Sequence, residues 1–456
     1  VRSGHFLQLS DIHLDPWYNA SMGRECFCNP PTGAEELAKC AASATGSTLG
    51  QHGCDAPAAL LRSVLAAAAA RAPPGGYDWV LITGDYTRHG MEEHQSPRSK
   101  AIVRGIMRQA VGAVREYFPD VALHHGLGYE PYILGNNDFT ADYNETVTDP
   151  RNGTNPWFSF LAPSAAASAA ALAASSHEQR PLAFDDAEWS PLDDQATFVY
   201  GGYGMRKLTH ELYMISLNTV MYSTNYHWEH DPEEDPFRQL RWLTRALEWL
   251  RKTNRDGSKV KALVTGHIPP TTDHFKFKAL WRDRFVKAYL AVIGNYTDVI
   301  AAQLFAHMHC DTFRLPPTDV AGPPVFITSS ISPVFDNNPS FRVWKYSGPA
   351  VVDYTMYSAD IESAPRQDLS FEPLYTATEA YGLKAMTTEE WRTKVADKLA
   401  TDDKVWEQYM SRLWQRGSGP AVQANTKSMA YRRKAVCAVK NIRRGDFEAC
   451  VAAQDA

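Results

Sequence analysis

The sequence predicts an α/β protein with a layered core, and three features lead to this prediction. Short apolar runs typical of buried strands recur along the chain. Amphipathic helical patterns fall between several of these runs, which favours a layered α/β core over a sandwich built only of strands. Residues able to bind ligands follow several of the strands, at the edge where open α/β sheets hold their ligands.

Strands are expected at residues 5–9, 79–82, 132–134, 212–217, 260–264 and 299–304. The clearest helix is expected to have Asp235 as its N-cap and Pro236 at its first helical position, and to end near residue 256. A second helix has apolar residues at 102, 106, 110 and 114 on one side and ends before Pro119. Strands and helices therefore alternate in this part of the chain.

Two regions depart from this alternation. Residues 164–176 are rich in alanine and fit either an insertion loop or a helix. From about residue 372 the strand signals fade, and helices are expected at 388–399 and 404–416. We therefore expect a C-terminal helical cap, closed by Cys437 and Cys450.

Composition narrows the class of protein. The 456 residues are 44% hydrophobic and 21% charged, with a formal net charge of −6. The chain lacks the basic field of nucleic-acid binders, so we expect no nucleic-acid recognition. No apolar run reaches the ~18–20 residues that a membrane-spanning helix needs, so we expect no transmembrane segment. A polyanionic substrate must therefore be met by local basic residues or by metal ions.

The cysteines indicate an oxidising compartment. Six of the seven fall into two local groups, which are Cys26, Cys28, Cys40 and Cys54, and then Cys437 and Cys450. Cys310 stands alone, so we expect three disulfides and one free thiol. Cys26 and Cys28 are too close to pair comfortably, which leaves two connectivities for the first group.

Glycosylation sequons support the same compartment. Asn-X-Ser/Thr sequences begin at Asn19, Asn144, Asn152 and Asn295, and they predict sugars on luminal surface loops. The chain begins at Val1 rather than at an initiator methionine, so we expect that a signal peptide or anchor has been removed. The sequence therefore predicts a protein of the secretory pathway.

Five short motifs carry the chemistry, and each is expected at the carboxyl end of a strand. They are Asp11-Ile12-His13, Gly84-Asp85 with Arg88-His89, Gly135-Asn136-Asn137-Asp138, Gly266-His267, and His307-Met308-His309. Loops at the carboxyl ends of strands converge on one crevice, so five loops can build one site. Side chains two residues apart at a strand end point to the same side, which suits shared coordination.

The residue types predict two divalent metal ions. The expected ligands are Asp11, His13, Asp85, Asn136, His267, His307 and His309. Carboxylate, amide oxygen and imidazole form a mixture that favours zinc, with manganese, iron or cobalt as alternatives. Asp85 is the natural bridging ligand, because one carboxylate can span metals ~3.5–4 Å apart.

The order of these motifs resembles that of the calcineurin-like metallophosphoesterases, and most of all the endopolyphosphatases and the acid sphingomyelinase-like phosphodiesterases. Residues 11–16, 54–57 and 216–219 and the terminal cysteine pair share in this resemblance, which extends over nearly the whole chain. It implies a β-sandwich flanked by helices, in place of the single layered sheet that the alternation favours. We accordingly assign residues 1–371 to a metallophosphoesterase domain and residues 372–456 to the C-terminal helical region.

One position departs from the superfamily pattern. Asn137 stands where most members have a histidine that contacts phosphate, and an amide can hydrogen-bond but cannot carry charge. The resemblance to endopolyphosphatases includes this position and the Arg88-His89 pair. His89 also matches a histidine of the acid sphingomyelinase-like enzymes, which makes it the candidate acid that protonates the leaving group. Asn136, Asn137 and Arg88 are expected to help hold the phosphate.

The sequence therefore predicts a metal-dependent hydrolase of phosphoanhydride or phosphodiester bonds, in which the cations activate water for in-line attack. Inorganic polyphosphate is the first candidate substrate, because of Asn137 and of the basic residues Lys276, Lys278, Arg282 and Arg284 after the fourth motif. The alternative is an acid sphingomyelinase-like phosphodiesterase that acts on nucleotides or phospholipid headgroups. A histidine beside two cations is protonated only in acid, which fits secretion or an acidic organelle such as a vacuole or lysosome.

Overall fold

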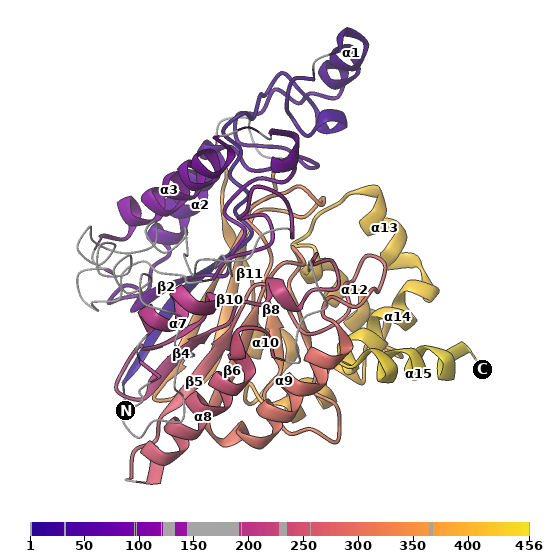
Figure 1. Ribbon diagram of the computed structural model, residues 1–456. Helices are drawn as coiled ribbons and strands as arrows, with labels where there is room; N and C mark the ends of the chain where they lie inside the picture. Colours follow the sequence, from indigo (N-terminus) through magenta and orange to yellow (C-terminus); the bar gives the residue numbers. More distant parts are fainter. Residues whose placement is uncertain are drawn as a thin grey trace.

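The computed structural model describes residues 2–31, 33–94, 96, 98–119, 121, 133–143, 191–192, 194–227, 235–255, 257–363 and 368–455. Within these residues, two β-sheets form the centre of the molecule and helices flank them (Figure 1). The β-sandwich flanked by helices is therefore confirmed. The single layered sheet favoured by the alternation of strands and helices is wrong.

The first sheet has the strand order β11-β10-β9-β1-β2. Its strands are β1 (Ser3–Leu9), β2 (Trp79–Ile82), β9 (Ser340–Ser347), β10 (Ala350–Ser358) and β11 (Glu372–Thr376). β1 runs parallel to β2 and antiparallel to β9, so that Phe6 lies opposite both Trp79 and Trp344. Because β1 has a partner on each side, its residues from Phe6 to Leu9 are buried.

The second sheet has the strand order β3-β4-β5-β6-β8-β7. Its strands are β3 (Gly204–Lys207), β4 (Leu212–Ser216), β5 (Lys261–Thr265), β6 (Ile300–Phe305), β7 (Thr312–Arg314) and β8 (Val325–Ile327). β4, β5, β6 and β8 are parallel, whereas β3 and β7 pair antiparallel at the two edges. The parallel strands bring their carboxyl ends to one edge of the sheet.

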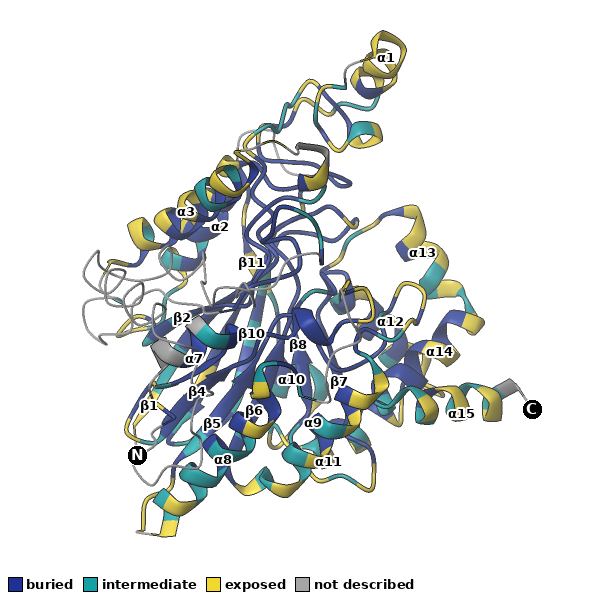
Figure 2. Cartoon of the chain, viewed as in Figure 1, coloured by how far each residue is buried: buried dark blue, intermediate teal, exposed yellow. Residues whose placement is uncertain are grey.

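Aromatic side chains join the two sheets. The ring of Phe326 in β8 lies 5.4 Å from Trp344 of β9 and 6.1 Å from Tyr354 of β10, measured between centroids. All three side chains are buried, and Figure 2 shows the strands as the buried interior of the molecule. Removing such rings from water is the main favourable contribution to folding.

The helices lie around this sandwich. Those that precede β6 are α1 (Ala34–Ala42), α2 (Ala58–Ala70), α3 (Ser99–Tyr117), α7 (Asp194–Gly201), α8 (Gln239–Arg255) and α9 (Asp283–Asn295). The C-terminal ones are α10 (Ala377–Tyr381), α11 (Thr388–Trp391), α12 (Asp403–Leu413), α13 (Pro420–Lys427), α14 (Met429–Lys440) and α15 (Arg444–Asp455). None of the described helices is long and apolar enough to cross a membrane.

All but one of the predicted strands are confirmed, as β1, β2, β4, β5 and β6. The strand predicted at 132–134 is not formed. Ile133 and Leu134 are buried, but they pair with no neighbouring strand. Residue 132 lies outside the described residues, as does the alanine-rich stretch 164–176. Directly after these residues, the backbone N–H of Gly135 donates to the carboxylate of Asp138 at 2.8 Å instead of to a neighbouring strand.

The helix predicted from Pro236 begins later than expected. Residues Pro236–Arg238 form a 3-10 turn in which Phe237 takes a left-handed φ of 52°, and α8 starts at Gln239. Asp235 nevertheless caps α8, since its carboxylate accepts from the N–H groups of Leu240 and Arg241 at 2.8 and 2.9 Å. The second predicted helix is confirmed as α3, which ends before Pro119.

The C-terminal region is helical, as predicted, but it begins with a strand. Residues 372–376 form β11, which pairs with β10 at the edge of the first sheet. Strand structure therefore extends beyond residue 371, where the sequence signal fades. The predicted disulfide between Cys437 and Cys450 is present and links α14 to α15.

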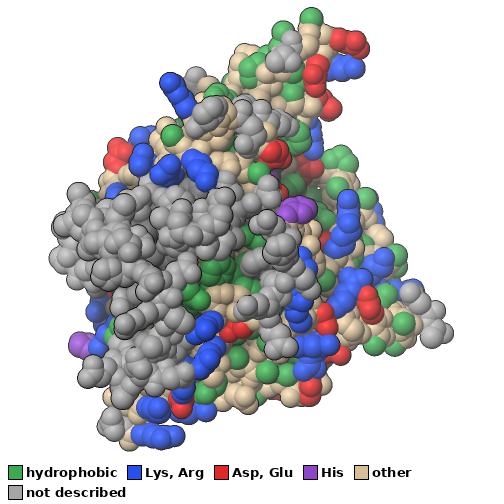
Figure 3. Space-filling model, in the orientation of Figure 1, with side chains coloured by type: hydrophobic (Ala, Val, Ile, Leu, Met, Phe, Trp, Pro, Cys, Tyr) green, Lys and Arg blue, Asp and Glu red, His purple; other side chains and the backbone are tan. Residues whose placement is uncertain are grey.

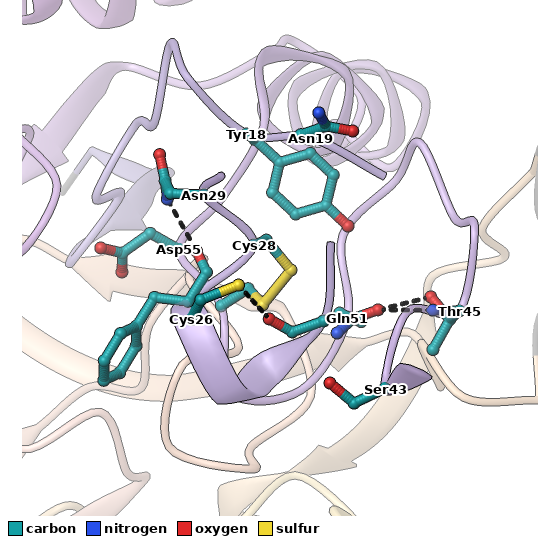
Figure 4. Close-up of a disulfide and its surroundings, with 12 residues drawn as sticks. Tyr18, Asn19, Cys26, Cys28, Asn29, Ser43, Thr45, Gln51 and Asp55 are labelled. Atoms are coloured by element: carbon teal, nitrogen blue, oxygen red, sulfur yellow. Dashed lines mark hydrogen bonds between the residues drawn. A yellow bond between two sulfur atoms is a disulfide. The ribbon is translucent and has the colours of Figure 1, made fainter. Parts of the chain in front are cut away.

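Two more disulfides tie the N-terminal segment to itself. They join Cys26 to Cys40 and Cys28 to Cys54, which selects one of the two connectivities left open by the sequence. Figure 4 shows this region, in which Gln51 accepts hydrogen bonds from the N–H and hydroxyl of Thr45 at 3.0 and 2.7 Å. Cys310 is free and buried, as expected.

Candidate active site

Six of the seven predicted ligands come from the carboxyl ends of strands in both sheets, whereas Asn136 follows residues 133–134, which form no strand. Asp11 and His13 follow β1, and Asp85 follows β2, in the first sheet. His267 follows β5, and His307 and His309 follow β6, in the second. The two sets meet because the sheets are joined at this end: the N–H of Ser332, beyond β8, donates to the carbonyl of Asp11 at 3.0 Å.

The described side chains form three groups of potential metal ligands, one of which is His13, His89 and His309. The other two groups share Asp85. One group is Asp11, His13 and Asp85, and the other is Asp85, His267 and His307, with the ligand atoms of each group within 4.8 Å of one another. Asp85 Oδ2 lies 3.4 Å from His13 Nε2 and 3.2 Å from His267 Nε2. Asp85 therefore occupies the place expected of a bridging carboxylate.

His309 completes the group of Asp11, His13 and Asp85. Its Nε2 atom lies 3.4 Å from Asp11 Oδ1 and 3.1 Å from His13 Nε2. Two imidazole nitrogens at this separation can share one hydrogen bond, and they are also close enough to bind the same cation.

Several buried polar atoms at the site have no hydrogen-bond partner. Among the described residues these include Asn136 Oδ1 and His309 Nδ1, whereas Asp11 Oδ1 and His267 Nε2 have only the ion-pair contacts given above. The amide nitrogen of Asn136 donates to Asp142 at 2.7 Å, which fixes the amide and leaves its oxygen as the free ligand atom. Buried polar groups are nearly always paired, so these atoms fit coordination of a cation. The donor set therefore fits the predicted pair of divalent ions.

The charges of the site also fit a cation. Burial alone would raise the pKa of Asp85, but His267 and His13 hold it well below its ordinary value. Against the opposing effect of burial, Asp85 raises the pKa of both His13 and His267 to about 9. Without a metal, protons on these imidazoles supply the positive charge between the carboxylates. A bound cation would displace those protons.

The backbone at the ligands is strained. Positive φ angles occur at Asp11 (46°), His13 (43°), Asp85 (54°), His307 (70°) and His309 (52°). A non-glycine residue in this conformation costs roughly 1–2 kcal/mol, and such strain gathers at functional sites. The surrounding structure therefore stabilises a conformation that turns these side chains toward one point.

Asp138 holds the second and third motifs together, a role that the sequence analysis did not assign. Its carboxylate accepts from the backbone N–H groups of Asp85, Tyr86, Thr87 and Gly135 at 2.7–3.1 Å. A β-carbon on Gly135 would lie 1.9 Å from Asp85 Oδ1, so only glycine allows this approach. The acid at the end of the third motif was the available signal.

His89 lies beside the donor groups and has its own carboxylate partner. Its ring stacks on His13 with centroids 3.9 Å apart. His89 Nδ1 is 3.0 Å from Asp55 Oδ1, and the N–H of His89 donates to Asp55 Oδ2 at 2.8 Å. Ser332 Oγ donates to the same carboxylate at 3.0 Å. Asp55 fixes the ring orientation, leaving Nε2 as the free ring nitrogen.

Asn137 and Arg88 contact other protein groups. The N–H and side-chain amide of Asn137 donate to the two oxygens of Asp85, each at 2.9 Å. Arg88 is buried, donates to the carbonyl of His89 at 2.8 Å and to Asn29 at 3.1 Å, and lies 3.8 Å from Asp15. Asn137 thus orients the shared carboxylate, and Arg88 joins the site to the disulfide-linked segment. Their role in holding phosphate stays a prediction.

A family model for the calcineurin-like phosphoesterases matches residues 4–311. The match takes up well over half of the chain and contains every predicted metal ligand. The chain therefore belongs to the calcineurin-like phosphoesterases, and it is a metallophosphoesterase.

Curated relatives narrow the comparison. Acid sphingomyelinase-like phosphodiesterase 3b of Mus musculus is 28% identical over 429 residues, which cover 89% of this chain and 82% of that protein. Sphingomyelin phosphodiesterase A of Dictyostelium discoideum is 24% identical over 464 residues, which cover 98% of this chain and 68% of that protein. A dimetal phosphatase structure from Danio rerio is 13% identical, covers 81% of this chain and 98% of its own, and has a TM-score of 0.40.

Proposed function

We propose that this chain hydrolyses phosphodiesters of the kind found in phospholipid headgroups, using two divalent metal ions held at the ends of β1, β2, β5 and β6. The observation that carries the proposal is the sharing of Asp85 by two groups of donor atoms. One carboxylate can span two ions ~3.5–4 Å apart. When bound, such ions lower the pKa of water and neutralise charge on the phosphoryl oxygens.

The chain's own residues would divide the remaining work. Asp11, Asp85 and the histidines of the two groups would hold the ions, with Asn136 contributing its unpaired oxygen. His89 would give a proton to the departing alkoxide, because it lies next to the donor groups and is only partly exposed. Asp55 would keep the His89 ring in place through the contact at Nδ1.

The sequence made polyphosphate the first candidate substrate and a phosphodiester the alternative. We now rank the phosphodiester first. The curated relatives carry phosphodiesterase names, which supports the alternative predicted substrate. The four basic residues that were expected to bind along a polyphosphate chain differ in their environments. Lys276 and Lys278 are exposed, whereas Arg282 donates to the carbonyl of Tyr226 at 3.1 Å and Arg284 lies over the ring of Phe285. Lys and Arg in Figure 3 lie in several separate groups.

The disulfides and the named relatives support a luminal or secreted location. Among the sequons in the described residues, Asn19 is partly exposed and Asn295 is exposed, so both are open to a sugar. Asn144 and Asn152 lie outside the described residues. Glycosylation, zinc as the metal and an acidic compartment remain predictions.

The test is a parallel assay on metal-loaded protein from a secretory host. Sphingomyelin, ATP and long-chain polyphosphate are incubated separately at pH 5, and phosphocholine or orthophosphate release is measured. Bound metal is counted in the same samples. We expect sphingomyelin turnover by wild type and none by Asp85→Asn, because the variant loses the shared carboxylate.

Each other result contradicts part of the proposal. Faster turnover of polyphosphate or ATP would move the assignment to phosphoanhydrides. Protein that binds two ions but hydrolyses none of the three substrates would be a phosphate-binding glycoprotein rather than an enzyme. Equal activity in the presence and absence of bound metal would remove the two-ion mechanism.

A further inference from the structure

An aromatic shelf extends from the candidate active site to the C-terminal helices. We define it as Phe335, Phe275 and Trp414. The ring of Phe335 lies 4.7 Å from His309 and 5.7 Å from His89, measured between centroids. Phe275 lies 5.3 Å from Phe335, and Trp414 lies 5.8 Å from Phe275. The rings therefore form a continuous path that begins at the proposed acid.

Three separate segments supply the shelf. Phe275 comes from the loop after β5, which also carries His267, and Phe335 comes from the loop after β8. Trp414 follows α12 of the C-terminal helical region. Because distant segments converge beside one catalytic group, the shelf is a feature of the folded molecule and is invisible as a sequence motif.

The loop that bears Phe335 is fixed by the C-terminal region. The side-chain amide of Asn338 donates to the carbonyl of Gln415 at 3.0 Å. A β-carbon on Gly417 would lie 2.2 Å from the carbonyl oxygen of Asp336, so the two segments are in close contact. Arg24 of the disulfide-linked segment pairs with Asp336 at 3.0 Å. The shelf is therefore held in place before any ligand binds.

The outer part of the shelf is apolar and open to solvent. Phe335 is 39% exposed and Phe275 is 44% exposed, whereas Trp414 is buried beneath them. Two neighbouring, partly exposed phenyl rings offer an apolar surface on which a hydrocarbon group can leave water. Their position beside His89 places them on the leaving-group side of the proposed reaction.

We infer that the aromatic shelf binds the hydrocarbon part of the leaving alcohol, so that the enzyme prefers phosphodiesters of long-chain alcohols. This inference rests on the proposed function, with His89 as the acid. Phe275 and Phe335 meet at 61°, and Phe335 is tilted by 75° from His89 and 70° from His309. Such ring edges and faces make a bent surface. A flexible alkyl chain can follow such a bent surface and gains by leaving water.

The test compares choline phosphodiesters that share one phosphate and one headgroup. Butyl and octyl phosphocholine are used below their micelle concentrations, and kcat/KM is measured for each. A methylene fully removed from water is worth about fourfold in an equilibrium constant. We expect wild type to prefer the octyl ester by on the order of tenfold. Phe335→Ala and Phe275→Ala should each lower that preference severalfold while the butyl rate changes little.

Matched variants control for general damage. Phe335→Leu keeps an apolar side chain and should retain most of the preference. Leu37→Ala removes an exposed apolar side chain from α1. This helix lies at the top of the view in Figure 1, away from the two sheets. Leu37→Ala should leave both rates unchanged.

A second pair of esters separates hydrocarbon from flat rings. Phenylethyl and cyclohexylethyl phosphocholine differ mainly in planarity. Loss on both esters in Phe335→Ala supports the inference, and loss confined to the phenylethyl ester would replace it with ring stacking. Equal octyl preference in wild type and both shelf variants would overturn the inference and leave the proposed function standing. Failure of wild type to hydrolyse any of the four esters would instead overturn the proposed function.

Discussion

At the scale of single residues, the site depends on partners that orient each ligand. His13 Nδ1 lies 2.9 Å from the carbonyl of Thr87, and His267 Nδ1 lies 2.7 Å from the carbonyl of Thr83. These contacts turn both Nε2 atoms toward Asp85. Partners of this kind raise the basicity of a ligating imidazole and fix its ring. The carbonyls of the segment that follows β2 therefore help to position the predicted metal ligands.

The role of His89 predicts a dependence on the leaving group. His89→Ala should reduce kcat/KM for an alkyl phosphodiester by roughly 10²–10⁴-fold, the usual contribution of a general acid. The loss should be smaller for an aryl phosphodiester, because a nitrophenolate leaves without a proton. Metal content should not change. Rates on both substrates and metal analysis of the same preparation check this.

His210→Ala is a suitable control, since His210 is an exposed histidine that follows β3. It should retain wild-type rates on both substrates. Equal losses on the alkyl and aryl esters in His89→Ala would show that His89 does not act as the acid.

The pairing of Asp55 with His89 predicts a pH-dependent stability. Burial alone would raise the pKa of Asp55, but His89 beside it holds that pKa well below its ordinary value. A carboxyl with a depressed folded pKa stabilises the fold above its unfolded value of about 3.9 and loses that contribution as the pH falls through the folded value. Asp55→Asn should therefore melt below wild type between about pH 5 and 7, and the difference should shrink in stronger acid.

Melting temperatures of both proteins across this pH range test the prediction. A difference that stays constant down to about pH 2 would mean that Asp55 contributes by packing rather than by charge. Asp55→Asn should also lower the rate on the alkyl ester, because the His89 ring loses the carboxylate that orients it.

At the scale of elements, the strand ends determine where the ligands lie. Strand periodicity located β1, β2, β5 and β6, so the residues that follow them could be assigned to one site before the structure was known. Asp55 could not be found in this way, because it follows a disulfide cysteine and not a strand. Its contact with His89 depends on the fold of a distant segment. The shelf was hidden for the same reason.

The start of α8 was mispredicted for a local reason. Pro236 suits the first position of a helix, but Phe237 adopts a left-handed φ that no sequence rule expects of a phenylalanine. The strand β11 was missed because it is an edge strand whose partner, β10, supplies the pairing. In both places tertiary contacts outweigh local preference.

The cap on α8 gives a prediction at this scale. Asp235→Ala removes two hydrogen bonds to the helix N-terminus and should lower the free energy of unfolding by about 1 kcal/mol. Asp283→Ala, at the exposed start of α9, removes only a surface pair with Lys287 and should cost about 0.3–0.5 kcal/mol or less. Denaturant titration of both variants tests the difference. Equal effects would show that the Asp235 contacts add nothing beyond a surface charge.

At the scale of the whole molecule, the C-terminal region is bound to the metallophosphoesterase core. Asp311 lies two residues after the predicted ligand His309, and its N–H donates to the carbonyl of Leu413 at 3.0 Å. The N–H of Leu315 donates to the carbonyl of Val439 at 2.9 Å. The division at residues 371 and 372 remains a prediction. These contacts, together with β11, favour unfolding of both parts in one transition.

The candidate metal site draws its residues from both sheets, which leads to the last prediction. Asp11 and Asp85 belong to the first sheet, and His267, His307 and His309 belong to the second, so bound ions would link the two sheets. Ions that bind only the folded state stabilise it, by about 2.7 kcal/mol at a free concentration 100-fold above Kd. We expect about two ions per chain by elemental analysis. Chelation should lower Tm, and restored metal should recover it.

Asp85→Asn tests whether one carboxylate serves both ions. If it does, the variant should lose both ions together, along with the Tm increase that metal produces in wild type. Asp298→Asn, which alters a surface pair with Arg251, should keep both ions. Loss of a single ion in Asp85→Asn would mean that the two groups of donors bind independently. Full occupancy would show that Asp85 is not a ligand, because a bridging carboxylate contributes to the affinity of each ion and cannot be replaced without weakening both.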